Sequence, residues 1–200
     1  MPSLGITGGI ATGKSSFTEC LLNYLPATRF DADRCAHELL AADAGVRRAV
    51  EEQFGAQSFG ADGNPNRAYL REVVFSDPGR RKLLEAVLHP VIRRRWMALA
   101  SEARAGKGWL FADIPLLFES GVESCFDHIA VVASPPNTQL RRLIDGRGLT
   151  SDLAQTMMST QIELPTKMSK ADHLIWNDSS LSCLDRQAAL LAGWLLKSHA

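Results

Sequence analysis

The chain has 200 residues, of which 46% are hydrophobic and 22% are charged, and this composition excludes a disordered protein and predicts a compact unit with room for a subdomain. Its 22 basic and 22 acidic residues cancel, so the chain lacks the overall positive field of a general nucleic-acid binder. No stretch approaches the ~18 apolar residues of a membrane helix, and we expect no leader sequence, because no basic segment followed by an apolar one precedes the first apolar run.

The four cysteines are scattered along the chain, and no pair is spaced as C-x-x-C. This spacing favours reduced thiols packed in a core over disulfides or a zinc site. Reduced cysteines are typical of cytoplasmic proteins. We therefore expect a cytoplasmic protein with no membrane and no nucleic-acid partner.

The first predicted elements are a strand, a glycine-rich turn and a helix, in that order. Residues 3–6 form a short apolar segment, and apolar residues recur at helical spacing from Phe17 until Pro26 ends the run. Between them, residues 8–15 read G-G-I-A-T-G-K-S, which matches the pattern G-x-x-x-x-G-K-S. This pattern wraps backbone N–H groups around nucleotide phosphates, so the turn predicts a nucleotide site.

The defining residues of this turn each have a chemical reason to be there. Gly8 and Gly13 permit backbone angles and a close approach that a Cβ would prevent. Lys14 can reach the β- and γ-phosphates, and the Ser15 hydroxyl can bind Mg²⁺. We expect the nucleotide to contact Gly9, Ile10, Ala11, Thr12, Gly13, Lys14, Ser15 and Ser16.

A second short strand is predicted at residues 27–30, and it runs into Asp31-Ala32-Asp33. In open α/β sheets, ligands bind outside the carboxyl ends of the strands, so both carboxylates would lie beside the crevice of the phosphate loop. On an extended strand, residues two apart cannot both point to one side, so one carboxylate would be chemical and the other structural. For each, capping of the helix that starts near Ala36 is the alternative role.

Strand signals fade after Arg34, and helical spacing dominates as far as Ala105. The pattern predicts a helical insert over residues 34–106. Within it we expect helices around residues 46–50, 70–74, 83–88 and 92–99, a glycine-rich loop at residues 55–66, and His89-Pro90 between the last two helices.

The insert carries a local excess of positive charge, since residues 67–95 hold eight basic side chains and three acidic ones. A solvated helix face accounts for most of them. One or two arginines facing the crevice would form a receptor for a second, phosphorylated substrate. His89 lies in this stretch; a lone histidine is more often a packing or capping residue, and we keep it as a ligand-binding candidate.

A buried parallel strand is predicted where the sheet resumes, because residues 109–112 form an uninterrupted apolar run that ends in Asp113. An acid at this place resembles a Walker B residue, which holds Mg²⁺ or its water shell opposite Ser15. A helix cap or a salt bridge is the alternative role for Asp113. Residues 114–119 continue as an apolar turn that one carboxylate closes.

The last part of the chain predicts two more strands and three helices. A strand at residues 128–133 is halted by Pro135-Pro136, and the helix after it carries Arg141 and Arg142. The alternation of strands and helices indicates a doubly wound parallel α/β sheet with one large insertion. The remaining predicted elements are a break at residues 145–148, a helix capped by Thr150 and running through Gln161, a strand at residues 173–176 after Asp172, and an amphipathic helix at residues 181–196.

These elements favour a small-molecule kinase among the proteins that carry a phosphate loop. A GTPase switch needs an N-K-x-D tetrapeptide, which the sequence lacks. A carboxylate at the second strand end, a helical insert and late arginines are arranged as in a small kinase. The arginines would close over the donor phosphates and exclude water, so that the γ-phosphate passes to an acceptor hydroxyl.

The motifs together resemble the dephospho-CoA kinase family along nearly the whole chain. The phosphate loop is shared with many families, whereas D-A-D, H-P and P-L-L-F-E in this order are close to unique to that one. The matching segments are Gly5 to Ile10, Gly13-Lys14-Ser15, Asp31-Ala32-Asp33, His89-Pro90, Pro115-Leu116-Leu117-Phe118-Glu119, Gln139-Leu140 with Arg142, Gln161, and Lys167 with Ala171-Asp172 and Asn177.

This resemblance implies a P-loop NTPase three-layer α/β fold with a parallel sheet, an inserted helical substrate domain and a short lid. Residues 1–33 and 107–200 would form the nucleotide-binding core, with the lid at about 145–168, and residues 34–106 would bind the CoA substrate. The implied activity is transfer of the ATP γ-phosphate to the ribose 3′-hydroxyl of dephospho-CoA, the last step of coenzyme A biosynthesis. The implied cofactors are ATP and Mg²⁺, and we expect a monomer.

The resemblance also implies roles for individual residues. Asp33 would orient and deprotonate the 3′-hydroxyl, and Lys14 would stabilise charge on the transferring group. Arg142 would act from the edge of the lid. Ser15 and Asp113 would hold the Mg²⁺, and the acceptor would be lined by Asp33, His89, Leu117 and Glu119.

The chain departs from the family pattern at three positions. Ala11 stands where relatives usually have Gly, and Gly146 and Met157 stand where they usually have Arg. Arg147 could substitute for the first missing Arg, but nothing evident replaces the second. A missing guanidinium could lower turnover by several powers of ten if it acts in the transition state. Ala11 matters only if the phosphate needs that backbone angle or space.

Two alternatives therefore stay open at this point. One is a nucleotide- or CoA-binding homologue that has lost efficient turnover, motivated by Gly146 and Met157. The other is a kinase of this shape that acts on another nucleoside-bearing acceptor.

Overall fold

The computed structural model describes residues 2–106 and 108–199. The chain forms two compact units, one of Met1–Asp31 with Leu99–Ala200 and one of Ala32–Ala98. Lys107, with which our predicted core resumes, lies outside the described residues. In the described part of the chain, no helix is both long enough and apolar enough to cross a membrane.

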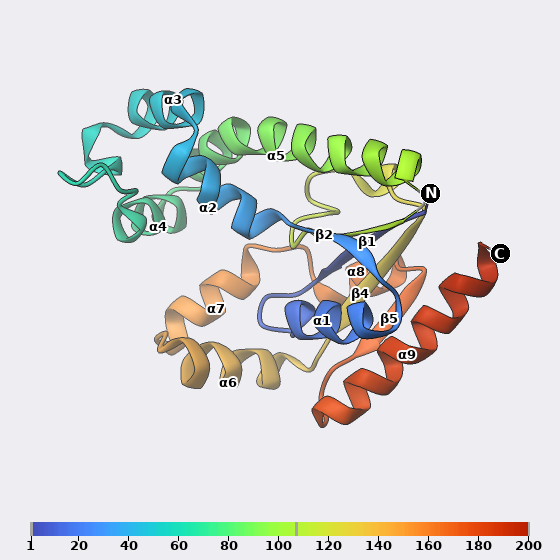
Figure 1. Ribbon diagram of the computed structural model, residues 1–200. Coiled ribbons are helices and arrows are strands. Elements are labelled where there is room, and N and C mark those ends of the chain that lie inside the picture. The colour runs from blue at the N-terminus through green and yellow to red at the C-terminus, as the bar shows by residue number, and fades with distance from the viewer. Residues whose placement is uncertain (1, 107, 200) are drawn as a thin grey trace. The chain divides into compact units, whose positions relative to one another are not determined.

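The first unit is built on a five-stranded sheet in which every pair of neighbours is parallel (Figure 1). The strand order is β2-β3-β1-β4-β5, so β1 lies at the centre. A parallel α/β sheet confirms the predicted fold class. The strands are β1 (Ser3–Gly8), β2 (Ala27–Asp31), β3 (Trp109–Asp113), β4 (His128–Ala133) and β5 (His173–Trp176).

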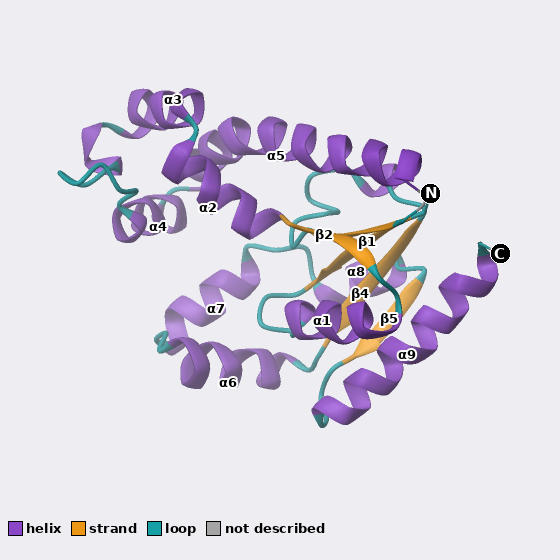
Figure 2. Cartoon of the chain, in the orientation of Figure 1, coloured by secondary structure: helices purple, strands orange, loops and turns teal. Residues whose placement is uncertain are grey.

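Both faces of the sheet are covered, which is why its inner strands are almost continuously apolar. Helices α1 (Lys14–Tyr24) and α9 (Leu181–Ser198) lie side by side over one face (Figure 2) and share a core with β1, β3, β4 and Ile175 of β5. On the other face, a Cβ at Gly5 would lie 2.7 Å from Leu117 and 3.0 Å from Phe126. Glycine is therefore required for the segment after β3 to pack against β1.

The second unit is helical, and its helices are α2 (Ala32–Ala42), α3 (Ala44–Phe54), α4 (Arg67–Ser76) and the larger part of α5 (Pro78–Gly106). Asp43 caps α3 by accepting from the Val46 N–H, and Asn66 caps α4 by accepting from the Tyr69 N–H. Buried side chains from each helix form its core: Leu39, Val46, Val50, Phe54, Leu70, Leu88 and Trp96.

One prediction for the insert was wrong, because α5 runs through His89-Pro90 as a single helix of 29 residues. Proline lacks an N–H, so Pro90 loses the one helical bond to the Ala86 carbonyl. Leu88 and Trp96, on either side of the proline, are both buried, and this packing favours continuation of the helix.

Helix α6 (Pro136–Arg147) continues through residues 145–147 of the predicted break and is capped by Gly148, the last residue of that break, whose φ of 65° is left-handed. Helix α7 (Ser151–Ser159) is capped by Thr150 as predicted but ends two residues before Gln161. A short helix that the spacing did not predict, α8 (Leu164–Ser169), follows it and begins at Leu164-Pro165.

Candidate active site

The phosphate loop joins the end of β1 to the start of α1, in the order that the sequence predicts. Gly8 and Gly13 have φ angles of 152° and 92°. A Cβ at Gly8 would collide with the Val132 carbonyl of β4, and one at Gly13 with the Asn177 amide. The loop therefore requires glycine at both positions for space as well as for backbone conformation.

Ala11 is the one non-glycine residue with a positive φ among the described residues, at 58°. Left-handed backbone costs an L-residue about 1–2 kcal/mol. The loop therefore holds Ala11 at a backbone angle that favours glycine, and the alanine carries a conformational cost.

Lys14 and Ser15 open helix α1, and their positions suit an anion. The Lys14 Nζ donates to the Gly9 carbonyl at 3.1 Å, which holds the ammonium group over the loop. Ser15 and Ser16 are exposed, and no acidic residue occupies the first turn. The positive end of the helix dipole is therefore available to a phosphate.

Side chains from distant parts of the chain hold this loop through its backbone. Arg142 of α6 donates to the carbonyls of Ala11 at 3.2 Å, Thr12 at 3.3 Å and Asn177 at 3.1 Å. The Asn177 Nδ2 donates to the Thr12 carbonyl at 2.8 Å, and the Ile10 N–H donates to Gln161 Oε1 at 2.9 Å. The sequence motifs included these three residues, but nothing local in the sequence indicated what they would contact.

Two carboxylates lie at neighbouring strand ends beside the loop. Asp113 ends β3, is buried, and is in register with Ile6 of β1 and Asp31 of β2. Asp31 lies 3.6 Å from the Arg29 guanidinium. Residues in register on parallel strands project to the same face of a sheet. Oxygen ligands of this kind, together with the Ser15 hydroxyl, suit Mg²⁺.

Asp33 lies on a helix, because β2 ends at Asp31 and α2 begins at Ala32. The strand alternation that we expected to turn Asp31 and Asp33 to opposite sides therefore does not apply to this pair. Asp33 is exposed in the first turn of α2, two residues beyond the carboxyl end of β2. Among the described residues, no group of three or more His, Cys, Asp and Glu side chains could enclose a metal ion.

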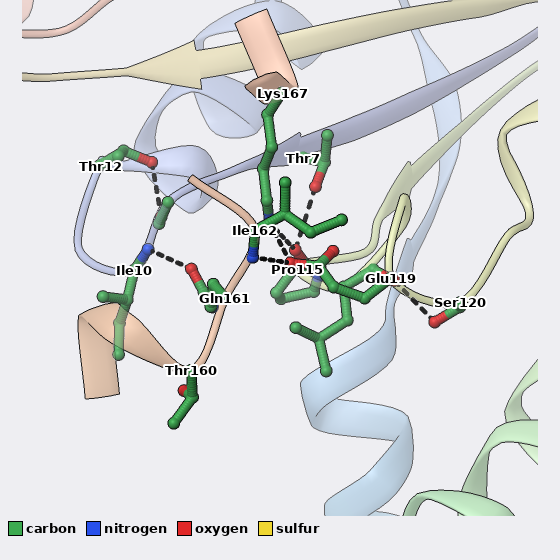
Figure 3. A network of polar contacts seen from close by, with 12 residues as sticks. Thr7, Ile10, Thr12, Pro115, Glu119, Ser120, Thr160, Gln161, Ile162 and Lys167 are labelled. Atoms are coloured by element: carbon green, nitrogen blue, oxygen red, sulfur yellow. Dashed lines mark hydrogen bonds and ion pairs between the residues drawn. The ribbon is translucent and has the colours of Figure 1, made fainter. Parts of the chain in front are cut away.

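The segment after β3 brings Glu119 to a fully buried lysine. Lys167 of α8 places its Nζ 2.8 Å from Glu119 Oε1 and donates to the Pro115 carbonyl at 3.1 Å (Figure 3). Glu119 Oε2 is buried and has no hydrogen-bond partner among the described residues. Leu117 is fully buried and packs beneath β1, so its side chain supports the segment from within the core.

The remaining candidates lie on helices. His89 is half-buried in α5 of the second unit, and Arg81 of the same helix lies 3.7 Å from Glu85. In the first unit, Gly146 lies in α6 and Met157 in α7. A Cβ at Gly146 would meet no atom within 4 Å, so a larger side chain fits at this position without a clash.

Comparison with known proteins gives one consistent family. A model of the dephospho-CoA kinase family matches residues 3–182. Proteins named dephospho-CoA kinase are 36% identical in Symbiobacterium thermophilum, over 97% of this chain and 80% of the relative, and in Listeria monocytogenes, over 92% of each chain.

Solved structures agree with these matches. A structure from Thermus thermophilus is 30% identical, with a TM-score of 0.78 over 98% of this chain and 97% of the other. Dephospho-CoA kinase from Campylobacter jejuni is 27% identical, with a TM-score of 0.72 over 99% of this chain and 98% of the other. Shikimate kinase from Bacteroides thetaiotaomicron, at 14% identity, a TM-score of 0.54 and coverage of 97% and 98%, is similar in fold alone.

Proposed function

The chain belongs to the dephospho-CoA kinase family, and we propose that it transfers the γ-phosphate of ATP to the ribose 3′-hydroxyl of dephospho-CoA. The main observation in support of this mechanism is the phosphate loop, which runs from β1 into α1 and whose Gly9 carbonyl accepts from the Lys14 Nζ. Backbone N–H groups from Gly9 to Ser16 would bind the ATP phosphates. Transfer of the phosphoryl group then depends on positioning and charge stabilisation.

Lys14 and Asp33 take the two chemical roles in this proposal. Lys14 has three N–H donors, so it can keep its contact with the Gly9 carbonyl while it donates to the transferring phosphoryl group and stabilises the charge that develops there. Asp33 accepts the proton of the 3′-hydroxyl, and its exposed position in the first turn of α2 leaves the carboxylate accessible to a substrate.

Ser15 and Asp113 fit the metal that ATP brings to such a site. A serine hydroxyl and one carboxylate are the protein ligands that Mg²⁺ commonly uses beside phosphates and water. When bound, the metal ion neutralises charge on the phosphates. Asp113 is buried at the end of β3, which fixes the position of its carboxylate.

Glu119 and His89, with Leu117 supporting from the core, complete the proposed acceptor side. Glu119 would line this side from the segment after β3, where Lys167 and the Ile162 N–H hold its Oε1. Arg142 acts here by holding the Ala11 and Thr12 carbonyls of the loop. We further propose that residues 1–33 with 107–200 bind the nucleotide, that residues 34–106 bind the CoA substrate, and that the enzyme acts in the cytoplasm as a monomer.

The test is an assay with ATP, Mg²⁺ and dephospho-CoA in which ADP and CoA are separated and quantified. The wild type forms both products in equal amounts, and Asp33→Ala reduces kcat by about 10²- to 10⁴-fold, as expected for loss of a general base. Glu52→Gln, an exposed residue on α3 of the same unit, is the matched control and keeps full activity. A wild-type rate no higher than that of Asp33→Ala overturns the proposal.

The acceptor is identified by competition. An analogue of dephospho-CoA that lacks the 3′-hydroxyl should bind and inhibit without being phosphorylated. Nucleoside monophosphates and adenosine should give no product at concentrations that saturate dephospho-CoA. Faster phosphorylation of one of them would assign the site to another nucleoside-bearing acceptor.

A further inference from the structure

The loop peptide between Gly9 and Ile10 is held from both of its sides. Its N–H donates to Gln161 Oε1 at 2.9 Å, and its carbonyl accepts from the Thr12 hydroxyl at 2.9 Å (Figure 3). The same carbonyl accepts from the Lys14 Nζ at 3.1 Å. Because a peptide group is planar, the orientation of the Ile10 N–H fixes the direction of the Gly9 carbonyl. Gln161 therefore helps to fix the direction of the Gly9 carbonyl, whose oxygen accepts from the Lys14 ammonium group.

Gln161 is itself positioned by the residue that follows it. The Ile162 N–H donates to Glu119 Oε1 at 2.9 Å. Two consecutive residues thus bind two different segments. Gln161 binds the phosphate loop through its side chain, and Ile162 binds the segment after β3 through its backbone N–H. The Ile162 contact fixes the backbone next to Gln161 and so restricts the position of the Gln161 Cα.

A buried ion pair holds Glu119 in turn. Lys167 is fully buried, and its Nζ lies 2.8 Å from the same Glu119 Oε1 that accepts from Ile162. A buried ammonium group is costly unless it is paired and hydrogen-bonded, so Lys167 and Glu119 constrain each other.

The contacts close into a ring that returns to the loop. Lys167 also donates to the Pro115 carbonyl at 3.1 Å, and the same carbonyl accepts from the Thr7 hydroxyl at 3.1 Å. Thr7 is fully buried and immediately precedes the loop. The loop is thus held at its base by Thr7 and near its tip by Ile10, through one connected network.

We propose that Gln161 is a positioning residue that acts on Lys14 through the Gly9–Ile10 peptide, and that the Lys167–Glu119 pair holds Gln161 in place. This inference rests on the proposed function, because it concerns how Lys14 is presented to the transferring phosphoryl group. Loss of the Gln161 acceptor leaves the peptide held through its carbonyl alone, so the Gly9 carbonyl defines the position of Lys14 less closely.

The first experiment replaces Gln161 by methionine, which keeps the length of the side chain and removes the acceptor. We expect kcat to fall about 10- to 100-fold, the range for a small misplacement of a catalytic group, while KM for dephospho-CoA stays within about twofold. Gln155→Met, an exposed residue on α7, is the matched control and keeps the wild-type kcat. A Gln161→Met kcat within twofold of wild type, or an equal loss in Gln155→Met, overturns the proposal.

The second experiment measures coupling between Gln161 and the ion pair. Because both act through one network, the loss of kcat in Gln161→Met/Lys167→Met should equal that of the worse single variant, whereas independent effects multiply. A Lys167 that merely stabilises the fold would lower the melting temperature but leave kcat per folded molecule unchanged. If Lys167→Met does not fold, the single Gln161→Met result still decides the proposal.

Calorimetric titration with ATP separates failure of this inference from failure of the proposed function. A wild type that binds ATP but does not phosphorylate dephospho-CoA disproves the function. In that case a Gln161→Met affinity for ATP equal to that of wild type also overturns the inference, and an affinity about tenfold weaker supports it.

Discussion

Two ion pairs, one in each compact unit, differ in how far they are buried. In the unit with the phosphate loop, Lys167 is fully buried against Glu119, and Arg142 donates to three backbone carbonyls. In the helical unit, Arg34 and Glu38 form an ion pair at 2.9 Å in which the side chains are 79% and 51% exposed. The Lys167–Glu119 pair is therefore fixed by burial, whereas the Arg34–Glu38 pair stays in contact with solvent.

This difference has a consequence for phosphate binding under the proposed function. Fixed donors around a loop need no reorganisation when a phosphate arrives, and such preorganisation is the main source of charge stabilisation in catalysis. Exposed ion pairs contribute about 0–1 kcal/mol, so a ligand phosphate can replace them at little cost. Under the proposed function, the buried pair would belong to the unit that positions the phosphates, and the exposed pair to the unit that binds the acceptor.

The largest expected effect is on stability and tests burial directly. Lys167→Met leaves the Glu119 carboxylate buried without its partner and should lower the free energy of unfolding by about 3–5 kcal/mol. Glu38→Gln removes an exposed partner and should cost no more than about 1 kcal/mol. Urea unfolding of both variants measures the difference. Equal losses would remove the contrast between the units.

A second variant separates geometry from charge at the loop. Arg142→Lys keeps the positive charge, but an ammonium group cannot reproduce the planar fork that reaches the Ala11, Thr12 and Asn177 carbonyls. We expect kcat to fall about 10- to 100-fold through displacement of the loop. Arg141→Lys, exposed on the same helix, is the control and should retain full activity. Equal activity in the two variants would show that charge alone suffices.

Local patterns in the sequence predicted the elements that local chemistry determines. The strand, glycine turn and helix around Lys14, the Thr150 cap and the acid at the end of β3 all follow from residues close together in the chain. The parallel sheet followed from apolar runs alternating with helical spacing. These features agree because each depends on short-range preferences.

Tertiary packing decided the features that the sequence did not predict. Pro90 stays inside α5 because buried residues lie on both sides of it, and no local signal indicates that outcome. Lys167 and Glu119 lie far apart in sequence, so their ion pair depends on how α8 packs beside the segment after β3. The same holds for Gln161 and Ile10, which the motifs named without indicating their contact.

A smaller effect tests strain in the loop. Ala11→Gly relieves left-handed backbone that costs about 1–2 kcal/mol, offset by about 0.4–1 kcal/mol of additional chain entropy in the unfolded state. The melting temperature should therefore rise by about 2 °C. Ala41→Gly on α2, an exposed helical position in the other unit, should lower it, because glycine is a poor helix former. A fall in both variants would show that the loop is unstrained at this residue.

The smallest effect concerns a histidine cluster at the amino ends of β4 and β5, opposite the carboxyl ends that carry the site. His128 lies at their start with its Nε2 2.8 Å from that of His199, and the His173 ring packs 4.5 Å from Trp194. Burial lowers the pKa of His128 from 6.5, and the neighbouring His199 lowers it further against the opposing influence of Asp172 and Asp127. Burial and then His128 likewise lower the pKa of His173, with Asp172 opposing.

Both shifts favour the neutral ring in the native state, so the unfolded chain takes up protons first as the pH falls through 6.5, and stability declines. Urea unfolding between pH 8 and pH 5.5 should show this decline, and His128→Gln/His173→Gln should flatten it. The double variant should keep the wild-type kcat at pH 7.5, because the cluster lies at the opposite strand ends from Asp113 and the phosphate loop. A double variant with an unchanged pH slope would show that these two rings do not control acid stability, and a lower kcat would show that the amino ends of the sheet influence the site.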